Sequence, residues 1–144
     1  EPTPGNTQPM GEPTGHAAAW DLATLSCMFG AMSGFFHGVR ICEAEGLPVD
    51  GFAQMICAIS PVLGEMIQAE GEAIHAGQYG EPESSMATCA GSGRLFVKQA
   101  REAQLDAGFP DFLKGQFDRA LGAGLGNERL AAMVKVLRQS PQPA

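Results

Sequence analysis

The amino-acid sequence predicts an all-α protein with one long central helix and several shorter helices. Residues 22–39, LATLSCMFGAMSGFFHGV, form an unbroken run without a charged side chain. Further along the chain, apolar residues recur with the 3.6-residue period of a helix. No segment alternates long enough with the period of two that half-buried strands show. These observations favour a helical domain over an α/β or an all-β fold.

The long helix is expected to extend beyond the uncharged run in both directions. Thr14 is a candidate N-cap, and Gly46 followed by Pro48 is typical of a helix that ends near Glu45. A helix of about 30 residues is about 45 Å long at about 1.5 Å per residue, which exceeds the diameter of a small domain. We therefore expect this helix to be almost wholly buried, with a second chain supplying part of its cover.

A second helix is expected from Asp50, its candidate N-cap, to about His75. Its apolar positions keep the helical period. Pro61 lies inside this segment, and a proline both removes a backbone donor and clashes with the preceding turn. We therefore expect a kink, or two abutting helices, at this point.

Three further helices complete the predicted order. The third is expected over residues 84–107 with Gly108 closing it, the fourth begins at Pro110, and Asn127 is the N-cap of a final amphipathic helix. The chain is thus predicted to consist of an extended arm, a helical domain and a disordered tail, which are residues 1–13, 14–138 and 139–144.

Composition and charge exclude some classes of function. The 144 residues are 44% hydrophobic and 17% charged, as in a folded domain or a piece of a larger enzyme. The net charge of −7 argues against nucleic acid as a partner, because phosphate binding needs a basic face. The GAGLGN segment joins two helices and follows no strand, so no phosphate-binding loop is predicted. The G-x-G at 91–93 indicates close packing or substrate approach instead.

The four cysteines show no metal-ligand spacing and have small or apolar neighbours. We expect Cys27, Cys42, Cys57 and Cys89 to be buried free thiols, which fits a reducing compartment. The N-terminus lacks the positive region of a signal peptide. These features predict a cytoplasmic protein without a bound metal.

A membrane-spanning interpretation of the uncharged run has to be weighed, because Gly30, Gly34 and Gly38 repeat as G-x-x-x-G. Its length is marginal, and an aromatic belt with basic flanks is missing. It also contains polar residues, which are Thr24, Ser26, Ser33 and His37. The sequence therefore favours a buried helix in a dimer, where the glycines let another backbone approach, and predicts no membrane partner.

Several charged residues look structural rather than functional. Glu43, Glu45, Glu70 and Glu72 are expected to form a solvated face. His37 is expected to be a packed core residue because it lies among apolar neighbours.

The order of several segments resembles a known family. The segments are GEPTGHAAAWDLATL, GFFHGVRICEAEGLPVDGF, AIHAGQYGEPESSM and DAGFPDFLKGQFDRALGAGLGNERLAAMVKVLR. In this order they resemble the C-terminal helical domain of the imine reductase and reductive aminase family. That family is part of the group similar to 3-hydroxyisobutyrate and 6-phosphogluconate dehydrogenases. The resemblance covers roughly residues 10–138.

The resemblance implies both an architecture and an activity. In such proteins an N-terminal Rossmann domain binds NADPH, and two helical domains intertwine as a homodimer. A small imine or amine substrate lies between one subunit's nucleotide domain and its partner's helices. This chain would then be the substrate-binding and dimerisation domain of an NADPH-dependent imine reductase-like oxidoreductase. Without the missing Rossmann domain, it is expected to bind no cofactor and to catalyse no reduction alone.

The resemblance also assigns Asp21 as the proton donor or amine-anchoring acid. Some members carry a tyrosine eight residues later, but this chain has Phe29, so Asp21 would have to act alone. On a helix, Met28 lies within about 20° of Asp21 and Phe29 is turned by about 80°. The candidate substrate-binding residues are Trp20, Met28, Phe29 and Met32.

Other interpretations of the same residues stay open at this point. Asp21 could simply complement the dipole of its helix, which is worth about 0.3–1 kcal/mol. The chain could also be a stand-alone helical dimer with a binding role. A third possibility is a non-redox enzyme that uses Asp21 as an acid or base.

Overall fold

The computed structural model of the chain describes residues 13–80 and 82–139, and it confirms the all-α prediction. Within these residues the chain forms helices and turns, and one isolated antiparallel bridge pairs Ser85 with Arg129. The arm and tail predicted at 1–13 and 139–144 lie outside the described residues, apart from Pro13 and Gln139.

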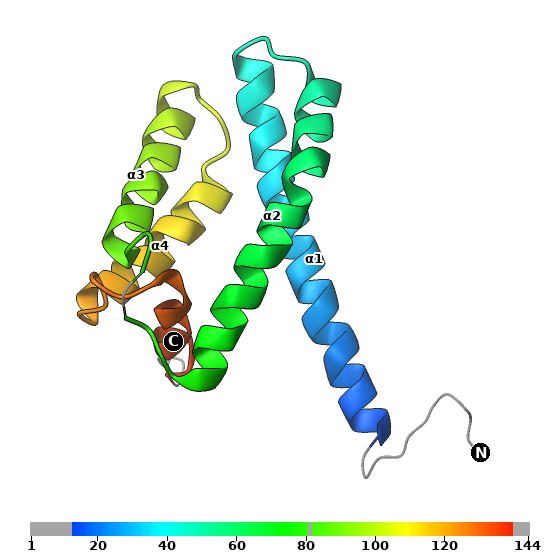
Figure 1. Cartoon of the computed structure of the whole chain (residues 1–144). Helices are drawn as coiled ribbons and strands as arrows, with labels where there is room; N and C mark the ends of the chain where they lie inside the picture. The colour runs from blue at the N-terminus through cyan, green and yellow to red at the C-terminus, as the bar shows by residue number, and fades with distance from the viewer. Residues whose placement is uncertain (1–12, 81, 140–144) are drawn as a thin grey trace. The chain divides into compact units, whose positions relative to one another are not determined.

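The described chain contains five α-helices and one 3-10 helix (Figure 1). It divides into two compact units, of which the first extends to Gly38 and the second begins at Val39. The elements are α1 (Pro13–Ala44), α2 (Val49–Ala76), α3 (Met86–Glu102), α4 (Gly108–Gly122), η1 (Leu130–Ala132) and α5 (Met133–Leu137).

Helix α1 has nearly the predicted bounds, and the chain by itself leaves most of it exposed. None of the most apolar 18-residue window of this helix is buried. The large side chains of residues 20–32 are exposed, positions from Gly34 to Ile41 are mostly half-buried, and Cys42 is buried. The described residues leave most of this surface open, so the expected burial, with a second chain supplying part of the cover, stays a prediction.

Two helices have the length and apolarity of a membrane span, which are Gly15–Ala44 and Val49–Ala76. This comparison uses length and composition only, and a core helix of a soluble protein also meets both criteria. The apolar character of α1 and α2 therefore indicates a surface that needs a cover, without naming the cover.

The end of α1 follows the sequence prediction. Gly46 has a φ of 71°, in the left-handed region that glycine adopts without strain. The backbone N–H of Leu47 then donates to the carbonyl of Cys42 at 2.8 Å, which satisfies a carbonyl of the last turn.

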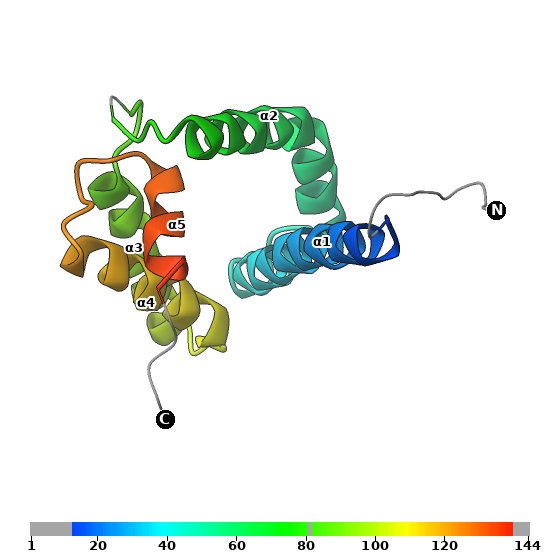
Figure 2. The same cartoon turned by 90° about the horizontal axis from the view of Figure 1, so that it is seen from below.

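Helix α2 passes through Pro61 without a break and bends (Figure 2). Proline has no N–H to donate to the carbonyl of Cys57, four residues earlier. The hydroxyl of Ser60 donates to that carbonyl at 2.8 Å instead. A side chain thus replaces the lost backbone bond, which explains why the helix continues as a single element.

The start of α2 differs from the prediction. The N-cap position is held by Pro48, and Asp50 lies in the first turn. Its carboxylate accepts from the neighbouring N–H of Gly51 at 2.9 Å. Asp50 therefore contributes negative charge near a helix N-terminus rather than a side-chain cap.

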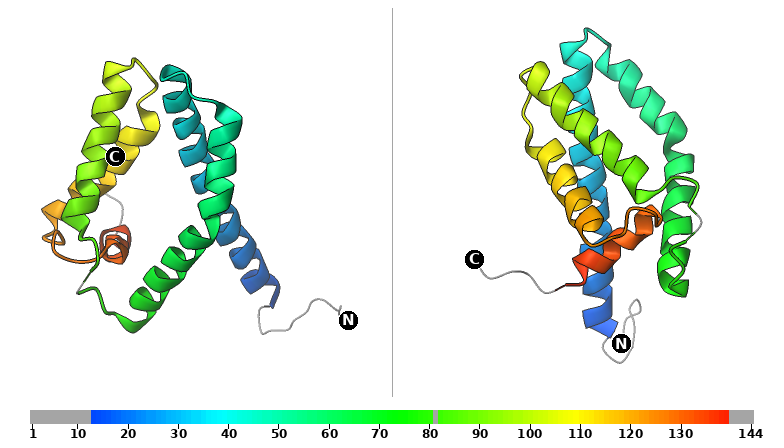
Figure 3. Two further views of the ribbon diagram at one scale, coloured as in Figure 1. Left: turned by 45° about the horizontal axis from the view of Figure 1, so that its top comes forward. Right: turned by 90° about the vertical axis from the view of Figure 1, so that its left-hand side faces the viewer.

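Helices α3 and α4 lie side by side and run in opposite directions (Figure 3). At Gly93 an added Cβ would lie 3.0 Å from the Phe117 ring, so the glycine permits close packing of the two helices. Of the G-x-G at 91–93, Gly93 is therefore a close-packing position. The core of this unit contains Met86, Ala120, Leu125, Ala132 and Val136.

Helix α3 ends at Glu102, five residues before the predicted end. The reason is Gln104, which has a φ of 57°, and the N–H of Leu105 donates to the Ala100 carbonyl at 2.8 Å. Gly108, predicted to close this helix, begins α4. A glutamine in a polar stretch gives no signal of a left-handed backbone conformation, so the sequence could not predict this helix end.

The last helix is shorter and begins later than predicted. Asn127 is not an N-cap, because Arg129 is extended with a ψ of 166° and the helical turns start at Leu130. The backbone N–H of Arg129 donates to the carbonyl of Tyr79 at 2.9 Å. This contact with a distant loop holds residue 129 in an extended conformation.

The described cysteines are free thiols, but their burial differs from the prediction. Cys42 is buried and Cys89 is half-buried, whereas Cys27 and Cys57 are exposed. The two exposed thiols lie on α1 and α2, the helices whose apolar surfaces the described chain leaves open.

Replacing Gln104 by glycine is expected to stabilise the protein by about 0.5–1 kcal/mol, because glycine adopts a positive φ without a Cβ penalty. Urea denaturation followed by circular dichroism measures the change. As a control, Gln54→Gly places glycine at an exposed interior position of α2 and should cost about 1 kcal/mol. Equal destabilisation by both changes would contradict the assignment of strain to Gln104.

Candidate functional site

The sequence-predicted acid, Asp21, lies on an exposed face of α1. At about 100° per residue, Leu25, Met28 and Met32 are all within about 40° of Asp21 around the helix axis. All four side chains are exposed. The helix thus presents one carboxylate at the head of an apolar stripe.

Distance along the axis limits which of these residues one small molecule could touch. At about 1.5 Å per residue, Leu25 lies about 6 Å from Asp21, Met28 about 10 Å and Met32 about 16 Å. A small ligand on the carboxylate would therefore reach Leu25 and Met28 but not Met32. Leu25 was missed by the sequence analysis, although its position four residues after Asp21 could have identified it.

Trp20 and Phe29 lie away from this stripe. Trp20 is 75% exposed and is turned by about 100° from Asp21. Its ring lines a shallow hollow of about 220 Å³ together with His16, Ala19 and Ala23. Phe29 is turned by about 80° the other way. The structure therefore groups Asp21 with Met28 and places Trp20 in a separate hollow.

Within the described residues, Asp21 has no hydrogen-bond or ion-pair partner, and its side chain is exposed. The first unit supplies one wall of a possible site. A carboxylate acts strongly on a bound cation only where water is excluded from the pair. The chemistry expected of Asp21 therefore requires a cover over this face of α1.

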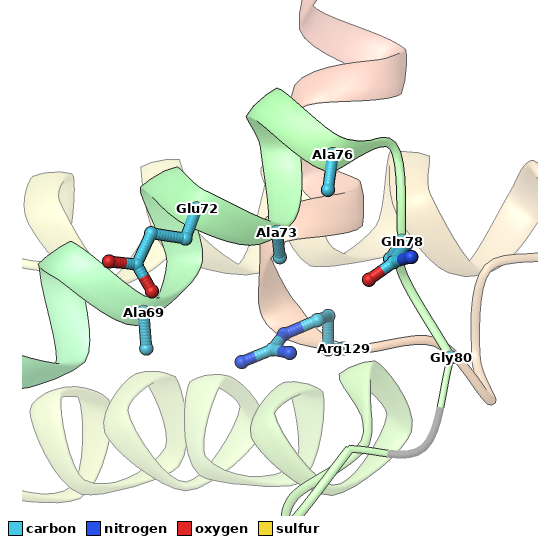
Figure 4. A pocket seen from close by; sticks show the side chains of 7 residues that line it. All are labelled: Ala69, Glu72, Ala73, Ala76, Gln78, Gly80 and Arg129. Carbon is cyan, nitrogen blue, oxygen red and sulfur yellow. The ribbon is translucent and has the colours of Figure 1, made fainter.

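The second unit contains a larger pocket of about 810 Å³ (Figure 4). One wall comes from the last turns of α2, and the others come from the loop after it and from the residue before η1. The lining residues are Ala69, Glu72, Ala73, Ala76, Gln78, Gly80 and Arg129.

Glu70 and Arg129 form a pair that attaches η1 to α2 beside this pocket. The Nε of Arg129 donates to Oε1 of Glu70 at 3.1 Å, and the backbone N–H of Ala131 donates to the same oxygen at 3.0 Å. Both side chains are less than a third exposed, at 29% for Glu70 and 28% for Arg129. The prediction that Glu70 belongs to a solvated face is therefore wrong, although Glu43, Glu45 and Glu72 are exposed.

A second ion pair supports the same region. Nζ of Lys135 lies 2.7 Å from Oε1 of Glu128 and 4.5 Å from the centre of the Tyr79 ring. The loop after α2 is thus held by a backbone bond to Arg129 and by a cation over an aromatic ring. In the described part of the chain, no group of three or more acidic, histidine or cysteine side chains could hold a metal ion.

Comparison with known proteins identifies the domain. The family model for the C-terminal domain of NADPH-dependent reductive aminase-like proteins matches residues 13–139. The chain belongs to this family. A curated relative, the NADPH-dependent reductive aminase of Aspergillus oryzae, is 23% identical over 137 residues, which are 93% of this chain and 46% of that protein.

Solved structures show the same fold. A reductive aminase from Aspergillus terreus in complex with NADPH and ethyl levulinate superposes with a TM-score of 0.83 at 23% identity, covering 92% of this chain and 47% of that one. An imine reductase from Bacillus cereus gives 0.85 at 18% identity, covering 94% and 47%. The chain therefore spans about half the length of the relatives that it matches.

Replacing Glu70 by alanine is expected to destabilise the protein by about 1–2 kcal/mol, because it removes the partner of a half-buried guanidinium and of a backbone N–H. Denaturation by urea measures the loss. Glu72→Ala is the matched control on the same helix, since Glu72 is exposed and, among the described residues, accepts one hydrogen bond, from Gln68 at 3.2 Å. That variant should stay within about 0.5 kcal/mol of the parent. Equal losses of unfolding free energy would show that the Glu70 contacts stabilise the protein no more than those of the exposed Glu72.

Proposed function

We propose that this chain is the substrate-binding and dimerisation domain of an NADPH-dependent imine reductase or reductive aminase. The family match supports the assignment to reductive aminase-like enzymes. The uncovered apolar face of α1 is the observation that supports the roles in substrate binding and dimerisation. The family's relatives are described as reductive aminases and imine reductases.

The proposed dimer rests on a set of exposed apolar side chains that we call the α1 surface. Burying one large apolar side chain contributes about 1.5–3 kcal/mol, so covering several of them could drive association. Apart from the nearby backbone of its own helix, no described atom lies within 4 Å of the place where a Cβ of Gly30 would be, which leaves room for another backbone. The α1 surface consists of Trp20, Leu22, Leu25, Met28, Phe29, Met32 and Phe36.

A second copy of the chain suits this surface better than a lipid bilayer. Ser33 and His37 interrupt the run, and Arg40 and Glu43 form an ion pair at its end. Polar and charged groups of this kind are costly in hydrocarbon, whereas a helix interface can hydrogen-bond them. The same cover would enclose Asp21 and give it the dry surroundings that its proposed role needs.

The residues of this chain do not fit an NADPH site. Dinucleotide sites place the pyrophosphate at a glycine-rich turn between a strand and a helix. The described residues contain no strand before any of their glycine-rich turns. We propose that NADPH, which supplies the hydride in such enzymes, is held by a separate nucleotide-binding domain.

Asp21 is the residue that we propose acts on the substrate nitrogen. A carboxylate can pair with a protonated amine or iminium group, or hold a proton at that nitrogen as the carbon is reduced. Leu25 and Met28 would form the apolar wall beside the pair. We further propose that the protein works in the cytoplasm, because the described cysteines are free thiols, as is typical of a reducing compartment.

If a second copy covers the α1 surface, light scattering should give twice the chain mass of 15.1 kDa in detergent-free buffer. Met32→Glu should reduce the mass to that of one chain, because it places a charge in the buried interface. Leu47→Glu is the matched control, at an exposed leucine outside the α1 surface, and should stay dimeric. A monomeric parent that partitions into neutral lipid vesicles would overturn the proposal.

The chain by itself is expected to bind no NADPH and to reduce no imine. Isothermal titration with NADPH tests the first point, and micromolar binding would contradict it.

In an intact enzyme that carries this domain, Asp21→Asn should lower kcat/KM for imine reduction by about 10²–10⁴-fold and leave NADPH affinity unchanged. An unchanged kcat/KM would exclude Asp21 as the catalytic acid without bearing on the dimer.

A further inference from the structure

We propose that the pocket between the end of α2 and Arg129 binds a small zwitterion, with one carboxylate and one ammonium group. This pocket lies wholly in the second unit, so the proposal does not depend on the role of Asp21 or on the dimer. Three features of the pocket support the inference. They are the charged side chains in its lining, the unpaired part of one guanidinium, and the small size of its other lining residues.

Arg129 supplies the group that would receive the carboxylate. Its Nε is taken by Glu70, and Figure 4 shows its guanidinium projecting into the pocket. Among the described residues, no hydrogen bond engages the two Nη atoms of this side chain. The open end of a guanidinium fork binds a carboxylate through two parallel hydrogen bonds.

Glu72 supplies the group that would receive the ammonium. It lines the same pocket, and its carboxylate accepts one hydrogen bond, from Nε2 of Gln68 at 3.2 Å. No basic side chain in the described residues is paired with it. A carboxylate with spare acceptor capacity next to a pocket favours a positively charged donor.

The balance of charge separates a zwitterion from a simple ion. The lining contains one basic and one acidic side chain, Arg129 and Glu72. A plain anion would be repelled by Glu72, and a plain cation would meet the guanidinium of Arg129. A ligand that carries both charges satisfies each partner.

The lining also bears on the ligand's polarity. Ala69, Ala73 and Ala76 leave space along one side of α2 because their side chains end at Cβ (Figure 4). Gln78 offers an amide to the same pocket. A wall of methyl groups and an amide, without an aromatic ring, suits a small polar molecule of the amino-acid class.

The test is a titration of the ¹⁵N-labelled chain by NMR with three probes at equal ionic strength. The probes are glycine, acetate and methylammonium. Glycine should shift the backbone amide signals of Gln78, Gly80 and Arg129, with a dissociation constant at least about tenfold below those of the two single-charge probes. Acetate binding as tightly as glycine would overturn the zwitterion assignment, and so would the absence of shifts with up to about 50 mM glycine.

Two variants on α2 test the roles of the residues. Glu72→Gln should weaken glycine binding at least about tenfold, because it removes the partner of the ammonium group. Glu65→Gln makes the same change at an exposed position outside the pocket and should leave binding unchanged. Equal effects of the two variants would overturn the proposal.

A third variant fills the pocket without changing its charge. Ala76→Leu, at an exposed position of α2, should abolish the glycine-induced shifts while the melting temperature stays close to that of the parent. Retained glycine binding by this variant would place the ligand elsewhere. The mass measurement tests the α1 surface, whereas these titrations test the pocket beside Arg129. Failure of the dimer proposal can therefore be told apart from failure of the zwitterion proposal.

Discussion

The apolar surface of α1 is the constraint on which the rest of this domain depends. A helix without a charge from Leu22 to Val39 is unfavourable in water unless something covers it. The described chain leaves its large side chains exposed, with Met28 at 56% and Phe29 at 65%. This exposed surface is the observation behind the proposal that a second copy of the chain packs against α1.

Asp21 draws its proposed chemistry from the same constraint. It stands at the head of a stripe formed by Leu25 and Met28, where its carboxylate is exposed to water. A cover over the stripe would exclude water and strengthen the interaction of the acid with a substrate cation. Association and catalysis would thus depend on one surface, whereas the pocket beside Arg129 is held by contacts within the second unit.

Local signals predicted most of the helices and several of their ends. Gly46 ends α1 because its backbone conformation is intrinsic to glycine, and the 3.6-residue period of α2 depends only on neighbouring residues. The predictions failed where contacts come from far along the chain. Arg129 is extended because its N–H donates to the carbonyl of Tyr79, so the last helix begins later than predicted. Glu70 is half-buried rather than solvated because it accepts hydrogen bonds from Arg129 and Ala131.

The amino-acid sequence by itself determined the helical class, the long uncharged helix, the resemblance to the imine reductase family and the acid at position 21. These properties follow from composition, periodicity and motif order, which need no knowledge of distant neighbours. Only the tertiary structure decided that the described chain leaves most of α1 exposed and that Glu70 meets Arg129. Both depend on contacts between distant parts of the chain, since residues 59 positions apart can share a hydrogen bond.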